Sequence, residues 1–289
     1  MKKKIIMAIT CLITILICSG CFDKEKIENI NITTTIYPAE YLVNKLYGEN
    51  SKISTIYPND TDVNEHTLSD KKMKEYAKNS NIFVYNGLTN EKEIAKTLIN
   101  KNKKIDLIDI SYGLPYKYGI EELWLNPNNY LMLANTIKKD LEEIINSKYA
   151  TVKIEENYNQ LIEELTSLDA ELRNIAEAAI KDGNNTIVIA YDSLGFLEKY
   201  GFNIINISNE NNISTSIKNK FKNKTYTKIF VADKNKISDS IKDIVDNYNV
   251  ELVEIDMMNT LTEEQRNNKE TYLTIMQDFF TNLSNAVLK

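Results

Sequence analysis

The longest uninterrupted pattern of hydrophobic and polar positions runs from Lys153 to Lys181. Its apolar residues recur at steps of three and four, which places them on one face of an α-helix, opposite a mainly acidic face. No Gly or Pro interrupts the pattern, and Asp182-Gly183 supplies a C-terminal stop. We therefore predict a single helix of about 40 Å, at about 1.5 Å per residue. Its apolar positions are Tyr158, Leu161, Ile162, Leu165, Leu168, Leu172, Ile175, Ala176 and Ala179.

Before this helix, short β-type runs alternate with helical patterns. The predicted strands cover residues 30–36, 52–56, 82–85 and 104–108, and the predicted helices cover 38–47, 70–78, 91–99 and 128–146. Such alternation implies a mostly parallel sheet, whose ligands bind at the carboxyl ends of the strands.

The alternation resumes after the long helix. Predicted strands cover residues 186–190, 203–207, 228–232 and 251–255, and predicted helices cover 193–200, 213–221, 236–247 and 269–288. We therefore predict an α/β fold of two lobes, each with a mostly parallel sheet flanked by helices, joined by one long rigid helix. The predicted boundaries are 30–150 for the N-terminal lobe, 151–183 for the linking helix and 184–289 for the C-terminal lobe. The alternative is an ordinary long surface helix without a linking role.

The N-terminus has the pattern of a secretory signal. Three lysines precede an apolar run over residues 5–17, which is shorter than the roughly 20 residues of a transmembrane helix. Ser19-Gly20-Cys21 is typical of a bacterial lipobox, although Cys18 replaces the usual Leu. We predict a lipoprotein signal peptide over residues 1–20, lipidation of Cys21 and a tether over 21–29. The alternative is an uncleaved N-terminal anchor. Both place the protein outside the cytoplasm, attached to the membrane.

Composition narrows the possible partners and cross-links. Cleavage removes Cys11 and Cys18 and leaves only the lipidated Cys21, which excludes a disulfide framework. The formal net charge of -6 becomes about -9 when the three lysines of the signal peptide are lost. This acidity argues against a nucleic-acid partner and is compatible with a cationic ligand.

Enzyme motifs are absent from the sequence. It contains no HExxH, GxSxG, P-loop or GxGxxG pattern. His66 is the only histidine, and no nucleophile pattern accompanies it, so we predict a binding protein rather than an enzyme. Asp256 follows the last predicted strand, at the position in the second lobe that corresponds to the His66 loop in the first. A solvated loop histidine and a helix-capping aspartate are the alternatives.

Four stretches of sequence occur in the order and spacing of one protein family. They are TTTIYP from Thr33, HTLSDKKMKEYAKNSNIFVYNG from His66, ELWLNP from Glu122 and YDSLGFLEKYG from Tyr191. Over residues 31–288 the chain resembles the metal-ion-binding lipoproteins of ABC importers, the manganese/zinc cluster of solute-binding proteins. The resemblance implies two α/β lobes joined by a rigid helix. It also implies one cation held between the lobes and passed to a membrane permease.

The resemblance further implies four metal ligands. The first family histidine is matched by His66 and the final aspartate by Asp256, whereas Glu122 and Tyr191 occupy the positions of the second and third ligands. Asp192 and Glu121 are neighbours that could substitute for them. The Pro-Pro-Gly lead into the first histidine is also missing from this chain.

A site with one imidazole, two carboxylates and a phenol is richer in oxygen than a zinc site with several histidines. Carboxylates favour Mn, Mg or Ca, whereas imidazole suits Zn or Fe, so we expect one divalent ion, manganese or iron before zinc. We expect a monomer whose partners are an ABC permease and, through Cys21, the membrane. Two alternatives stay open: an adhesion or surface interaction protein with a degenerate site, and an importer component for a small organic ligand.

Overall fold

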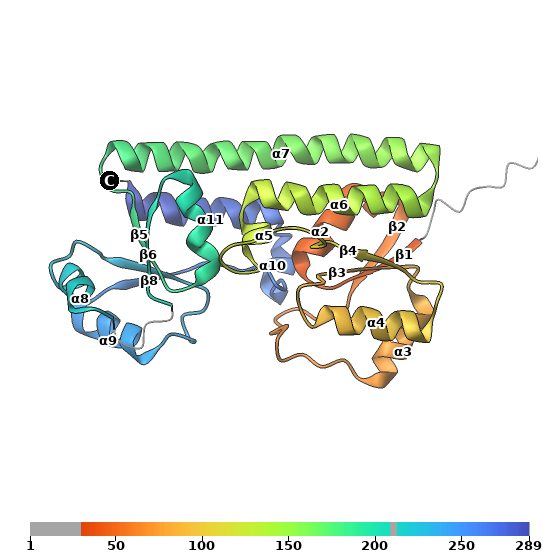
Figure 1. Cartoon of the computed structure of the whole chain (residues 1–289), viewed down its shortest axis with the longest axis horizontal. Helices are drawn as coiled ribbons and strands as arrows, with labels where there is room; N and C mark the ends of the chain where they lie inside the picture. The colour runs from red at the N-terminus through yellow and green to blue at the C-terminus, as the bar shows by residue number, and fades with distance from the viewer. Residues whose placement is uncertain (1–29, 209–212, 289) are drawn as a thin grey trace, which may run out of the picture.

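Two lobes are attached to the underside of one long helix (Figure 1). The computed structural model describes residues 30–208 and 213–288, so the predicted signal peptide and Cys21 lie outside the described residues. The long helix, α7 (Lys148–Lys181), has 34 residues and begins earlier than the predicted Lys153. The side chain of Ser147 caps it by accepting a hydrogen bond from the Ala150 backbone N–H at 3.4 Å. The predicted fold class, two α/β lobes joined by one helix, is confirmed.

The N-terminal lobe contains one four-stranded parallel sheet in the order β2-β1-β3-β4. Its strands are β1 (Ile30–Thr34), β2 (Ser51–Thr55), β3 (Ile82–Tyr85) and β4 (Asp106–Asp109). Its helices are α2 (Tyr37–Tyr47), the 3₁₀ turn η1 (Gly48–Asn50), α3 (Asp70–Asn79), α4 (Glu91–Lys101), α5 (Glu122–Leu125) and α6 (Pro127–Ile145).

The C-terminal lobe repeats this topology in the order β6-β5-β7-β8, again with all strands parallel. Its strands are β5 (Thr186–Ile189), β6 (Asn203–Asn206), β7 (Lys228–Val231) and β8 (Glu251–Glu254). Its helical segments are η2 (Asp192–Tyr200), α8 (Thr215–Lys222), α9 (Asp239–Tyr248), α10 (Glu263–Asn268) and α11 (Tyr272–Val287).

Two sequence predictions in this lobe need correction. The helix predicted over 193–200 is a 3₁₀ helix, η2, that begins one residue earlier, at Asp192. The closing helix predicted from residue 269 begins at Tyr272 instead, because Lys269 adopts a left-handed conformation (φ 58°) that ends α10. Thr271 then starts α11 with a capping box formed with Thr274.

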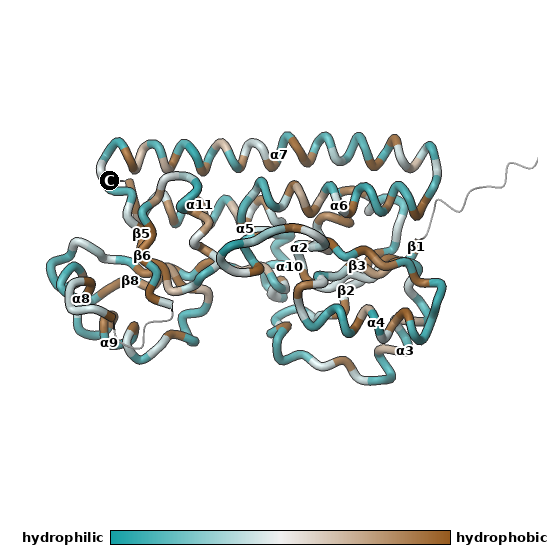
Figure 2. The backbone as a smooth tube through the Cα atoms, viewed as in Figure 1, coloured by the Kyte–Doolittle hydropathy of each residue, from teal (hydrophilic) through white to brown (hydrophobic). Residues whose placement is uncertain are grey.

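The apolar face of α7 packs along α6 and also contacts α2 and α11, which belong to different lobes. In Figure 2 hydrophobic positions recur along α7 between hydrophilic ones, as its sequence pattern predicts. One large hydrophobic cluster therefore extends through both lobes beneath the helix. A second, smaller cluster lies only in the C-terminal lobe. Among the described residues no helix is both long and apolar enough to cross a bilayer.

The C-terminal part of the chain also joins the lobes. The indole Nε1 of Trp124 donates a hydrogen bond to the Met257 carbonyl at 2.8 Å, and the Tyr272 hydroxyl donates to the Trp124 carbonyl at 2.6 Å. The Tyr272 ring stacks on Tyr130, with 4.0 Å between ring centroids. These contacts fix the segment between β8 and α11 against the N-terminal lobe, and that segment carries Asp256.

Candidate metal site between the lobes

The loops at the carboxyl ends of the strands meet where the lobes face one another. The Tyr37 backbone N–H donates to the Asn259 carbonyl at 3.0 Å, and the Thr260 hydroxyl donates to the Thr61 carbonyl at 3.1 Å. The ammonium of Lys236 lies 2.7 Å from the Asp62 carboxylate. This is the edge at which parallel sheets bind ligands.

His66 ends a tight turn in the long loop after β2. Its backbone N–H donates to the Asp62 carbonyl at 3.1 Å, and its side chain is partly exposed. The imidazole packs nearly perpendicular to the Tyr57 ring, with 5.6 Å between the centroids and 85° between the planes. Within the described residues the imidazole has no hydrogen-bond partner.

Asp256 lies directly after β8, as predicted, but its carboxylate is engaged within its own lobe. One oxygen accepts the Met258 backbone N–H at 2.7 Å, and the other accepts the Gln265 side-chain amide at 2.7 Å. Each carboxylate oxygen has a second lone pair, so these bonds leave acceptor capacity for a cation.

Glu122 is buried, with 1% of its surface exposed, and its carboxylate has a full set of partners. It lies 2.7 Å from the Lys199 ammonium of the C-terminal lobe. It also accepts the backbone N–H groups of Lys117 and Tyr118 at 2.9 and 3.1 Å. Desolvation opposes ionisation, yet these hydrogen bonds together lower the pKa of the Glu122 carboxyl. Glu122 is therefore an anion that joins the lobes by a salt bridge.

The adjacent Glu121 makes the cross-lobe contact with Tyr191. The Tyr191 hydroxyl donates to one Glu121 oxygen at 2.8 Å, and the Ser193 hydroxyl donates to the other at 2.6 Å. Burial and the Glu121 charge raise the pKa of the Tyr191 phenol, which therefore keeps its proton at neutral pH. Tyr191 lies opposite Glu121 rather than the predicted Glu122.

A cavity of about 90 Å³ lies beside Glu121, mainly within the N-terminal lobe. Its lining includes Tyr57, Glu91, Glu121, Trp124 and, from the C-terminal lobe, Asn259. The sequence analysis missed Glu91, which is only 2% exposed. Burial raises the pKa of its carboxyl to about 7. An acidic residue at the first position of a helix is ordinary, so only the NG turn that precedes it marked the position.

The four predicted ligands are therefore placed as follows. His66 contacts Tyr57, Tyr191 contacts Glu121, and Glu122 and Asp256 are bound by other partners. Among residues 30–208 and 213–288, no three His, Cys, Asp or Glu side chains form a group that could hold a metal ion. The ligand set stays a prediction that needs measurement.

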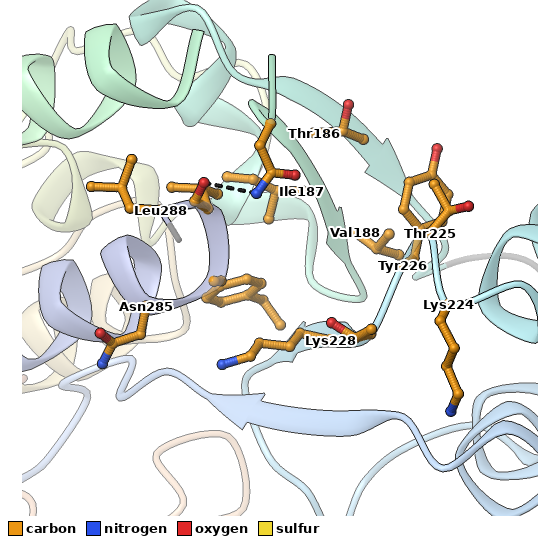
Figure 3. A pocket seen from close by; sticks show the side chains of 14 residues that line it. Thr186, Ile187, Val188, Lys224, Thr225, Tyr226, Lys228, Asn285 and Leu288 are labelled. Atoms are coloured by element: carbon orange, nitrogen blue, oxygen red, sulfur yellow. Dashed lines mark hydrogen bonds between the residues drawn. The ribbon is translucent and has the colours of Figure 1, made fainter. Parts of the chain in front are cut away.

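A larger hollow, of about 470 Å³, lies at the opposite end of the C-terminal sheet (Figure 3). Thr186, Tyr226, Lys228 and Leu288 line it, together with residues that include no His, Cys, Asp or Glu. Without a carboxylate or an imidazole in its lining, this hollow is not a site for a divalent cation.

Two parallel sheets, joined by one unbroken helix and meeting at their strand ends, define the class of two-lobed binding proteins. The chain belongs to the ZnuA family, described as zinc-uptake complex component A, periplasmic, whose profile matches residues 32–286. This is a family of extracytoplasmic solute-binding components of importers rather than of enzymes. The resemblance to metal-ion-binding solute-binding proteins is confirmed.

Solved structures share the fold at low sequence identity. The Zn(II)-bound ZnuA-like domain of Streptococcus pneumoniae AdcA is 20% identical, with a TM-score of 0.73 over 90% of this chain and 100% of that one. The metal-dependent lipoprotein YcdH from Bacillus subtilis is 16% identical, with a TM-score of 0.74 over the same shares. The periplasmic zinc-binding protein TroA from Treponema pallidum is 16% identical, with a TM-score of 0.69 and again the same shares. No curated protein sequence matches the chain.

Proposed function

We propose that the protein is the lipid-anchored solute-binding component of an ABC importer. It captures one divalent metal ion between its lobes and delivers it to a membrane permease, acting as a monomer. The observation that carries this proposal is family membership over residues 32–286. The cross-lobe pair of Glu121 and Tyr191 supports it, because a ligand between them contacts both lobes at once.

We propose zinc as the preferred metal cargo of the protein. The sequence alone favoured manganese or iron, because Glu122 and Tyr191 replace nitrogen ligands with oxygen. Zinc is named in the family description and bound in the AdcA domain, so zinc now precedes manganese and iron.

For the ligands we propose His66, Asp256 and Tyr191, with Glu121 in place of the predicted Glu122. Glu121 has two neutral hydroxyl donors as partners, and a cation can replace them without leaving a buried charge. Removing Glu122 from Lys199 would instead leave an unpaired ammonium at the lobe interface. Tyr191 becomes a ligand only when the metal displaces its proton.

Calorimetric titration of the metal-stripped protein with Zn²⁺, Mn²⁺ and Fe²⁺ tests the proposal. We expect one ion per chain, with binding abolished by His66→Ala and by Asp256→Ala. Glu121→Gln should weaken zinc binding about tenfold or more, whereas Glu122→Gln should change it much less. The absence of binding heat with all three metals would refute the cation-receptor function.

The lipid anchor is a separate part of the proposal. Cys21 lies outside the described residues, and the support comes from the lipobox pattern and from YcdH, which is named a lipoprotein. Metabolic labelling with a fatty acid should mark the wild-type protein and not a Cys21→Ala variant. Label retained in Cys21→Ala would refute the assignment.

The second candidate function is that of a surface interaction or adhesion protein with a lost metal site. The observation that favours it is the engagement of Glu122 and Asp256 with protein partners. A small organic cargo fits less well, because about 90 Å³ is far below the roughly 300 Å³ of a typical small-molecule pocket.

A further inference from the structure

The imidazole of His66 rests against a single aromatic ring. His66 is the only histidine of the chain, and the Tyr57 ring is the ring contact that it makes, at 5.6 Å and 85°. Metal-binding histidines usually have their second nitrogen fixed by a hydrogen bond, which sets the tautomer and the ring orientation. Here no such bond is found among the described residues. The Tyr57 ring is therefore the contact that orients the imidazole.

Tyr57 is itself held rigidly. Its side chain is 5% exposed, and its backbone N–H donates to the Thr55 hydroxyl at 3.3 Å. Its phenol lies near the Glu91 carboxyl, and both residues line the same cavity. Burial is the main cause that raises the pKa of the Tyr57 phenol, so the phenol stays protonated and is able to donate to the Glu91 carboxyl.

Glu91 is anchored on its other side by the turn between β3 and α4. One carboxyl oxygen accepts the Asn86 backbone N–H at 2.7 Å, and the Glu91 backbone N–H donates to the Thr89 hydroxyl at 3.3 Å. The chain of contacts thus runs from the turn through Glu91 and Tyr57 to His66. It joins the ends of β2 and β3, which are separated in the sheet by β1.

The surroundings of Glu91 give the carboxyl few charged neighbours. Its carboxyl accepts the Asn86 backbone N–H, and Asp109 is the nearby charge that acts on it. Glu121 lines another part of the same cavity.

We propose that Tyr57 and Glu91 are positioning residues that fix the orientation of the His66 imidazole for a divalent cation. The inference rests on the proposed function in that His66 is taken as a ligand. The orientation of the imidazole can nevertheless be measured without any metal. Glu91 acts through Tyr57, and neither residue is assigned as a ligand.

The position of Glu91 also couples this arrangement to pH. Its carboxyl has a pKa of about 7, so it ionises close to neutrality. The ionised form is the stronger acceptor for the Tyr57 hydroxyl and adds a negative charge to the cavity wall. Cation binding is therefore expected to strengthen as Glu91 loses its proton, in addition to the ordinary effect of histidine deprotonation.

Nuclear magnetic resonance of the metal-free full chain with isotopically labelled histidine tests the positioning. His66 is the only imidazole, so it gives one set of ring signals without any assignment problem. Tyr57→Leu and Glu91→Ala should each move these signals, because the aromatic ring is removed or released. Glu91→Gln keeps an acceptor for the Tyr57 hydroxyl and should restore the wild-type signals.

Matched controls separate positioning from general loss of structure. Tyr76→Leu removes a tyrosine whose hydroxyl donates to the Thr55 carbonyl at 3.4 Å and which has no recorded contact with His66. Glu93→Gln removes an exposed carboxylate in the same first turn of α4. Both should leave the His66 signals unchanged. If Tyr57→Leu does not fold, Glu91→Ala and its rescue by Glu91→Gln carry the test.

Zinc affinity gives the second measurement. Tyr57→Leu should weaken Zn²⁺ binding about three- to tenfold, the range for loss of one aromatic contact. Between about pH 6 and pH 8 the affinity of Glu91→Gln should rise less steeply than that of the wild type. Unchanged His66 signals in folded Tyr57→Leu and Glu91→Ala would overturn the inference. Wild-type protein that binds no zinc would overturn the proposed function, and the metal-free spectra would still decide the positioning.

Discussion

Glu121 and Glu122 are neighbours at the start of α5, yet their carboxylates lie in different surroundings. Consecutive residues of a helical turn point about 100° apart. Glu122 therefore reaches Lys199 and two backbone N–H groups, whereas Glu121 reaches Tyr191 and Ser193. The motif spacing in the sequence identified Glu122, and it could not show which of the two carboxylates was already neutralised.

The salt bridge between the buried Glu122 carboxylate and the half-exposed Lys199 ammonium predicts a cost in stability if it is lost. Glu122→Gln should lower the free energy of unfolding by about 2 kcal/mol at pH 7, because it removes the charge that pairs with Lys199. The folded-state pKa of Glu122 is lowered, so its contribution is present above the unfolded pKa and is lost as the pH falls through the folded value. Urea unfolding measures both effects. Glu121→Gln is the matched control, and an equal loss in that variant would contradict the assignment.

Glu91 predicts the opposite dependence on pH. Its pKa is raised from 4.5 to about 7, so the folded protein binds more protons than the unfolded chain between these values. Stability therefore falls as the pH rises through this window, by an amount on the order of 3 kcal/mol. Glu91→Gln should remove that fall in unfolding experiments from pH 4.5 to 8. Glu93→Gln should retain it, and a pH profile that is identical in wild type and Glu91→Gln would refute this origin.

At the scale of elements, the loop after β2 depends on the other lobe for its fixed geometry. The turn that ends at His66 begins at Asp62, whose carboxylate lies 2.7 Å from Lys236 in the loop after β7. The Lys236 hydrogen bond is the main cause that lowers the pKa of the Asp62 carboxyl. This ion pair thus joins the two loops at the edge of the proposed site.

Removing this ion pair should make zinc leave faster. Lys236→Met is expected to raise the zinc dissociation rate by about threefold, because exposed pairs contribute at most about 1 kcal/mol. Stopped-flow mixing with a chelator measures the rate. Lys234→Met is the matched control, since Lys234 lies 4.0 Å from Glu254 of its own lobe. A rate that rises equally in both variants would show that the loss of surface charge, and not the cross-lobe pair, is responsible.

At the scale of the whole molecule, the two hydrophobic clusters predict unequal local stability. The larger cluster lies beneath α7 and extends through both lobes, whereas the smaller one lies within the C-terminal lobe around Phe221 and Ile241. Hydrogen exchange should therefore be faster in α8 and α9 than in α2 and α6. Mass spectrometry of exchanged peptides measures this order. Equal protection of all four helices would show that the molecule opens only as one unit.

The straight helix α7 should fix the angle between the two lobes. Glu171 is exposed on α7, so its side chain is not needed for packing. Glu171→Pro should cost about 3 kcal/mol in unfolding free energy and weaken zinc binding, because a kink changes the angle between the lobes. Glu171→Ala, at the same position, should leave both unchanged. Wild-type zinc affinity in a folded Glu171→Pro protein would show that a straight helix is not required.

Local sequence patterns were sufficient to predict the architecture of this protein. The steps of three and four residues in the long helix, and the alternation of helical patterns with short β-type runs, predicted both parallel sheets and the helix between them. Local pattern is sufficient for these features, because each element buries its own apolar face. The sequence pattern was less accurate at the ends of helices. Lys269 is an example, because a left-handed residue other than Gly or Asn has no strong sequence signal.

The contacts of each carboxylate and phenol depend on the tertiary structure. Glu122 and Tyr191 have partners in the other lobe, whereas Asp256 and His66 contact residues of their own lobe. The cross-lobe contacts depend on the angle between the lobes, which neither residue type nor spacing in the sequence specifies. The burial of Glu91 has the same origin, because desolvation belongs to the assembled interior and not to the chain.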